Sequence, residues 1–89
     1  MLLEEVMQQL EEYGTEQNRK TYKNHGAKEP LFGVSFANLK LLKKKIKKDH
    51  DLAILLWETK NMDAMTLATM ILDPKKVTTE LLNKWVQEV

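Results

Sequence analysis

The chain of 89 residues contains no cysteine, which excludes disulfide bonds, thiolate metal sites and a cysteine nucleophile. No apolar run approaches the roughly 20 residues that span a bilayer, and the acidic N-terminal segment lacks the pattern of a secretory signal. Glycine-rich phosphate loops, zinc-ligand spacings and nucleophilic triads are missing as well. We therefore expect a soluble, cytoplasmic protein that has no membrane partner and no metal or cofactor.

The net charge of +1 hides an uneven distribution of charge along the chain. Between residues 15 and 48, ten Lys and Arg side chains are opposed only by Glu16 and Glu29, which gives this segment +8. Residues 1–14 carry four acids and no base, and residues 49–89 carry seven acids against four bases. A segregated basic patch is typical of proteins that bind the phosphate backbone of nucleic acids. A solvated, lysine-rich helix face would give the same pattern.

Apolar residues recur at helical spacing through most of the chain and nowhere alternate with period two, which predicts an all-α fold. At this length the chain makes one small domain, which we assign to residues 1–89. Four polar residues are placed to cap the helices that follow them, namely Thr15, Ser35, Asp49 and Asn61. The predicted helices cover about residues 2–13, 15–24, 36–48, 50–59, 62–72 and 79–89, with a loop over 26–35 and a break at Asp73-Pro74.

The helices over residues 50–59 and 62–72 are apolar on several sides, so we expect them to form the core. The helix over residues 36–48 should bury a stripe of Phe36, Leu39, Leu42 and Ile46. Beside that stripe it should expose a lysine row of Lys40, Lys43 and Lys47, flanked by Lys44 and Lys48.

The last helix stays amphipathic to its final residue, and no polar capping unit follows it. This pattern favours short antiparallel helix pairs in a HEAT-like or ARM-like superhelical array, in which a further repeat would cover Val86 and Val89. No literal sequence repeat supports the array, and the periodicity allows a compact bundle almost as well.

The segment from Tyr22 to Trp57, YKNHGAKEPLFGVSFANLKLLKKKIKKDHDLAILLW, and the segment DPKKVTTELLNKWV from Asp73 resemble the N-terminal part of the DNA alkylation repair proteins. The resemblance covers about residues 8–89. It rests on the order of four features: the Arg-Lys-x-Tyr segment, the Phe-Gly-Val-Ser loop before the lysine-rich helix, the acidic turn before the Trp57 helix, and the Asp73-Pro74 break.

The resemblance implies a curved solenoid of HEAT-like repeats, in a family whose active members excise N3- and N7-alkylated purines from DNA without a metal. The family residues tied to base excision are an aromatic, an Asp and a later Arg, and they lie beyond the part matched here. We therefore assign no catalytic residue, and whether the chain is an enzyme stays open. Tyr22 matches a tyrosine that faces lesion-bearing DNA in the family, although the residues alone favour a helix-packing aromatic.

Our leading interpretation is a DNA-binding N-terminal part of an alkylpurine glycosylase-like protein, whose partner is duplex DNA, alkylated or intact. Together with Tyr22, the residues expected to face DNA are Arg19, Lys20, Lys23, Lys40, Lys43, Lys44 and Lys47. The alternative is a HEAT-like interaction module. Such a module would bind a protein partner through the basic face, or self-associate through the uncovered stripe of Leu82, Val86 and Val89.

Three consecutive polar residues, Asp49, His50 and Asp51, raise the question of a metal site. Adjacent residues on a helix point in different directions, and no second cluster supplies further ligands at a useful spacing. A helix cap with an acidic first turn explains the three residues better.

Overall fold

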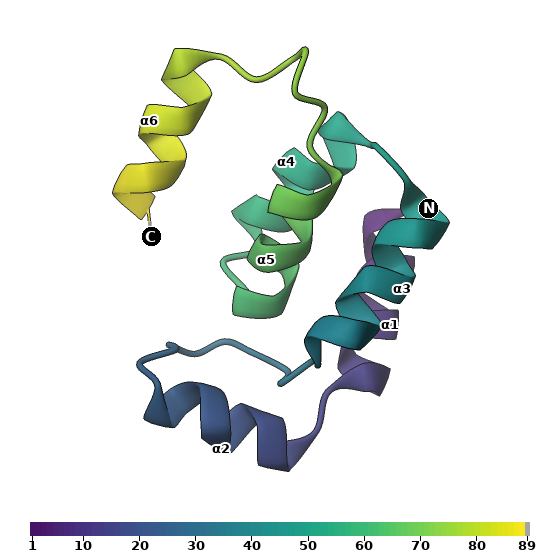
Figure 1. Ribbon diagram of the computed structural model, residues 1–89, viewed down its shortest axis with the longest axis vertical. Helices are drawn as coiled ribbons and strands as arrows, with labels where there is room; N and C mark the ends of the chain where they lie inside the picture. Colours follow the sequence, from purple (N-terminus) through teal and green to yellow (C-terminus); the bar gives the residue numbers. More distant parts are fainter. Residues whose placement is uncertain (89) are drawn as a thin grey trace.

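The computed structural model describes residues 1–88, which form six helices and no strand (Figure 1). The helices are α1 (Leu3–Tyr13), α2 (Glu16–Asn24), α3 (Phe36–Ile46), α4 (His50–Glu58), α5 (Met62–Ile71) and α6 (Thr79–Glu88). Their number and positions confirm the predicted all-α class. None of the helices in this range combines the length and the hydrophobicity that a membrane span requires.

All four predicted N-caps are confirmed. The side chains of Thr15, Ser35, Asp49 and Asn61 each accept a backbone N–H from the first turn of the following helix, at distances of 3.0–3.2 Å. These acceptors satisfy N–H groups that have no partner within the helix. The caps therefore fix where α2, α3, α4 and α5 begin.

A short turn joins α4 to α5, so these two helices form an antiparallel hairpin, and α1 and α3 pack against it (Figure 1). As predicted, this hairpin supplies most of the core, with Leu56, Leu67 and Ile71 fully buried. Helix α1 adds Val6 and Leu10 to the same cluster. Figure 1 shows α2 lying across one end of this arrangement, where the loop that follows it returns toward α5.

Helix α6 lies apart from the other helices and is reached through residues 72–78 (Figure 1). Its Trp85 stacks on Trp57 of α4, with ring centroids 4.1 Å apart and ring planes within 3° of parallel. On another side of α6, Leu82 and Val86 are 51% and 74% exposed. This agrees with the predicted uncovered stripe, whose third member, Val89, lies outside the described residues.

Two predictions about the lysine-rich helix are wrong. Phe36 is 57% exposed rather than buried, because it is the first residue of α3 and lies at the edge of the core formed by Leu39 and Leu42. The helix also ends at Ile46, since Lys47 adopts a positive φ of 65° that a helix cannot continue. Lys47 and Lys48 therefore leave the predicted lysine row.

Candidate nucleic-acid interface

The loop over residues 26–35 is held in place by a buried carboxylate. Asp63, in the first turn of α5, is only 4% exposed, and its two oxygens accept the backbone N–H groups of Phe32, Gly33 and Val34. Hydrogen bonds to an ionised acceptor are roughly twice as strong as neutral ones. Asp63 therefore ties the loop to α5 across about thirty residues of sequence.

The sequence alone does not reveal this role of Asp63, which is a lone acidic residue at the start of an apolar helix. Its place after the cap Asn61 is fully explained by a favourable interaction with the helix N-terminus. The sequence carried no separate signal for the loop contact.

Two further backbone contacts fix the same loop. The N–H of Met62 donates to the carbonyl of Pro30 at 2.9 Å, and the N–H of Thr15 donates to the carbonyl of Gly33 at 3.1 Å. Gly33 has a φ of +80°, and a Cβ atom there would come within 2.5 Å of the Thr15 carbonyl oxygen. Only glycine permits this close approach between the loop and the start of α2.

Tyr22 joins α2 to the same loop. Its phenolic O–H donates to the carbonyl of Val34 at 2.7 Å, and the side chain is half-buried. Burial raises the pKa of Tyr22, and the nearby negative charge of Asp63 raises it further. This geometry agrees with the packing interpretation of Tyr22, but the residue also lines the cavity described next, so packing and ligand contact are compatible.

A first cavity of about 440 Å³ lies between the end of α2, the start of α3 and the first turns of α5. Tyr22, His25 and Phe36 contribute three aromatic rings to its lining, and Met62 and Thr66 contribute side chains from α5. It is therefore an aromatic-lined recess whose walls come from three different helices and the loop after α2.

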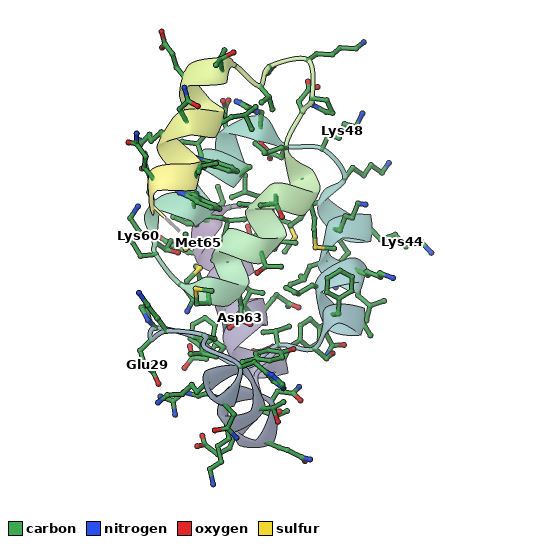
Figure 2. The ribbon with its side chains drawn as sticks, turned by 60° about the vertical axis from the view of Figure 1, so that its left-hand side comes forward. Glu29, Lys44, Lys48, Lys60, Asp63 and Met65 are labelled. Atoms are coloured by element: carbon green, nitrogen blue, oxygen red, sulfur yellow. The ribbon has the colours of Figure 1, made fainter. Side chains whose placement is uncertain are left out.

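A second cavity of about 490 Å³ adjoins the first, and Gly26, Met62 and Thr66 line both. Trp57 and Met65 line its apolar part, and Lys28, Glu29 and Lys60 are its charged lining residues. Figure 2 shows Glu29, Lys60 and Met65 on one side of the molecule and Lys44 and Lys48 on the other, with Asp63 between them.

The predicted cations of α2 are partly neutralised. Arg19 forms ion pairs with Glu16, at 3.6 Å, and with Glu29, and the Lys23 ammonium lies 3.0 Å from the same Glu29 carboxylate. The hydrogen bond from Lys23, helped by the charge of Arg19, lowers the pKa of Glu29. Lys20 is exposed and forms no ion pair with the described residues.

The predicted cations of α3 are arranged differently. Lys40, Lys43 and Lys44 are exposed, and no carboxylate among the side chains that the structure describes pairs with them. Figure 2 shows Lys44 projecting away from the helix core. We call these three residues the α3 lysine cluster. The predicted cations therefore fall into three places. They are the α3 lysine cluster, the α2 residues Arg19, Lys20 and Lys23, of which Arg19 and Lys23 pair with Glu29, and Lys47 in the turn after α3.

Asp49 acts as the cap of α4, as the sequence predicts, because its carboxylate accepts the N–H of Leu52 at 3.1 Å. Over the part of the chain that the structure describes, no group of three or more His, Asp or Glu side chains is arranged to hold a metal ion.

Comparison with known proteins agrees with the resemblance found in the sequence. The family model described as DNA alkylation repair enzyme matches residues 6–89. A solved structure from a new family of proteins related to the HEAT-like repeat DNA glycosylases, with affinity for branched DNA structures, superposes with a TM-score of 0.94. It is 41% identical to this chain and covers 99% of it. The predicted HEAT-like architecture is thus confirmed.

Two curated relatives come from Listeria. The uncharacterized protein Lmo0209 of Listeria monocytogenes is 36% identical over 70 residues, and the uncharacterized protein Lin0241 of Listeria innocua is 37% identical over 70 residues. Each alignment covers 74% of this chain but 31% of the relative. The matched part is 37% of the solved structure, so the chain spans about a third of the length of these proteins.

Proposed function

Since the chain belongs to the DNA alkylation repair enzyme family, we propose that it binds DNA and that the α3 lysine cluster contacts the phosphate backbone. The observation that carries this proposal is that Lys40, Lys43 and Lys44 are exposed and lack carboxylate partners among the described residues. The affinity of a structural relative for branched DNA supports the same class of ligand.

The geometry of α3 suits a polyanion. Residues three and four positions apart on a helix are neighbours, so the ammonium groups of Lys40, Lys43 and Lys44 lie along one flank. Like charges at these spacings repel one another, and a phosphate chain would relieve the repulsion. Leu39 and Leu42 anchor the neighbouring flank in the core, which keeps the lysine cluster on the surface.

The remaining predicted residues would make a second, weaker set of contacts. Lys20 and Lys47 are exposed, but Arg19 and Lys23 share Glu29, so a phosphate must compete with that carboxylate. We expect α2 to add less affinity than α3. Tyr22 would face the bound DNA from the cavity wall, as the family resemblance implies.

The test is a fluorescence-anisotropy titration of a short duplex across a salt series. The variant carries Lys40→Gln, Lys43→Gln and Lys44→Gln, and the control with the same charge change carries Lys75→Gln, Lys76→Gln and Lys84→Gln. Loss of three phosphate contacts should reduce the slope of log affinity against log salt by about 2.7. The control should keep most of the slope. Equal losses in both variants, or no binding by the parent chain at low salt, would overturn the proposal.

For base excision we propose no residue of this chain. The resemblance assigns that chemistry to residues beyond the matched segment, so this chain alone should release no alkylated base from methylated DNA. Detection of free N3- or N7-alkylpurine after incubation with the purified chain would contradict this expectation.

A second candidate function is self-association through α6, which the exposure of Leu82 and Val86 favours. Association driven by apolar burial should respond little to salt, in contrast to DNA binding. Sedimentation velocity over a concentration series would test it, with Val86→Glu as the disrupting variant and Gln87→Glu as the control on the same helix. A single monomeric species at all concentrations would exclude this function.

A further inference from the structure

We propose that the first cavity receives an unpaired nucleobase of branched DNA, stacked against Phe36. The proposal rests on the proposed DNA binding and names the structural class of DNA that the site prefers. It starts from the composition of the cavity. The chain has only six Phe, Trp and Tyr residues, yet Tyr22 and Phe36 both line this recess together with the imidazole of His25.

Phe36 is placed as a stacking surface rather than as a core residue. Its side chain is 57% exposed, whereas Trp57 and Trp85 are 5% and 6% exposed and stack on each other. An aromatic ring left in water carries a hydrophobic cost that a flat apolar ligand would remove. Every nucleobase has such a flat face, and stacking on aromatic side chains is a main source of affinity for unpaired bases.

The charges around the ring fit the rest of a nucleotide. The Lys40 ammonium lies over one face of the Phe36 ring, 5.2 Å from its centre, in a cation–π contact, so a base would stack on the other face. Lys43 lies one turn further along the same helix. A base stacked on Phe36 would therefore carry its own phosphate toward the α3 lysine cluster. The one carboxylate in the lining, that of Asp63, is already engaged by three N–H groups of the loop.

The cavity can also read the edge of a base. Thr66 Oγ1 donates to the carbonyl of Met62 at 2.9 Å, which leaves its lone pairs able to accept from an exocyclic amino group. The Met62 thioether is polarizable and packs well against aromatic ligands.

The geometry favours an unpaired base over one in an intact duplex. A paired base is covered on both faces, and bringing it into a cavity requires unstacking, which is least costly for a base that is already unpaired. Branch points supply such bases beside duplex arms, and the arms would bind the lysine cluster. The lysine cluster would therefore bind any duplex, and the first cavity would add affinity for branched DNA only.

The experiment compares a three-way junction containing unpaired bases at its centre with a duplex of the same length, both measured by anisotropy with the full chain. The test variant is Phe36→Ala, and Phe36→Tyr retains a stacking ring. The control is Leu41→Ala, which removes an apolar side chain of α3 that is 51% exposed and lies outside the cavity lining. We expect Phe36→Ala to weaken junction binding about 5- to 150-fold, the range for loss of one stacked base. Its duplex affinity should stay close to that of the parent, because a paired base would have to unstack before it could enter the cavity.

A fluorescent base analogue, 2-aminopurine, at the junction centre gives a second readout. Its emission should be quenched by the parent chain and by Phe36→Tyr, and not by Phe36→Ala. If Phe36→Ala binds and quenches like the parent, or if the parent binds junction and duplex equally, the inference fails while the proposed duplex binding stands. If the parent binds neither DNA at low salt, the proposed function itself fails.

Discussion

Replacing Asp63 by Asn should destabilise the fold far more than its single-atom change suggests. The carboxylate accepts three backbone N–H groups, and each hydrogen bond to a charged acceptor contributes about 1.5–3 kcal/mol. The amide keeps one carbonyl oxygen but presents an NH₂ group to at least one N–H donor. We expect a loss of about 2–4 kcal/mol, since a buried donor without an acceptor costs about 1–3 kcal/mol and the charge is lost as well.

This loss is large for a chain of this size. At about 0.05–0.15 kcal/mol per residue, the free energy of unfolding should lie near 4–13 kcal/mol. Asp63→Asn should therefore still fold, whereas Asp63→Ala, which removes all three acceptor contacts, should approach the limit of stability. The assay is urea unfolding followed by tryptophan fluorescence, since the stacked Trp57 and Trp85 report on α4 and α6.

The matched control is Asp51→Asn. Asp51 also lies in the first turn of a helix, α4, but its side chain is exposed. Its carboxylate should contribute only about 0.3–1 kcal/mol through the helix dipole. The reasoning would be refuted if Asp63→Asn lost no more stability than Asp51→Asn, or if amide exchange at Gly33 and Val34 did not accelerate in Asp63→Asn.

Three further predictions concern the elements that surround this carboxylate. Gly33→Ala should lower the free energy of unfolding by more than the roughly 1–2 kcal/mol that a left-handed backbone costs a non-glycine residue, because its Cβ would meet a backbone oxygen at 2.5 Å. Urea unfolding checks this against Gly26→Ala, since Gly26 also has a positive φ but open space around it. Trp85→Ala should remove the near-ultraviolet circular dichroism of the tryptophan pair and speed amide exchange in α6, whereas Leu82→Ala, at an exposed position, should leave both unchanged. The pKa of Tyr22 should lie above its usual value near 10. The stability that the neutral side chain contributes is therefore complete below pH 10 and is lost as the pH rises through the raised pKa. The absorbance of tyrosinate, compared with that of Tyr22→Phe, measures this shift.

Local rules predicted the helix starts well and one helix end poorly. The starts of α2, α3, α4 and α5 each have a polar cap that acts within three residues, so the sequence contains all the atoms involved. The end of α3 is different, because the lysine-rich pattern continues past Ile46. The N–H of Asp49 donates to the carbonyl of Ile71 at 2.9 Å, and the chain turns through Lys47 to reach the end of α5. That contact depends on the tertiary fold and leaves no local signal.

The cations of the candidate interface could be located from the sequence, but their pairing could not. Glu29 follows Arg19 and Lys23 by ten and six positions and lies in a loop, so no helical spacing predicts its contacts with them. The exposure of Phe36 was missed for a related reason. A helical wheel assigns its direction but not the point at which the core ends.

The contrast between Asp51 and Asp63 shows where inference from sequence stops. Both are acidic residues in the first turn of a helix, and the helix dipole explains each of them equally well. Asp63 differs only because the loop 29–31 residues before it lies against α5. Val34 in that loop donates its N–H to Asp63 and accepts the O–H of Tyr22, so one residue connects α5 to α2 through both of its backbone groups. The position of the Tyr22 ring in the first cavity thus depends on a carboxylate that no local pattern distinguishes from a helix cap.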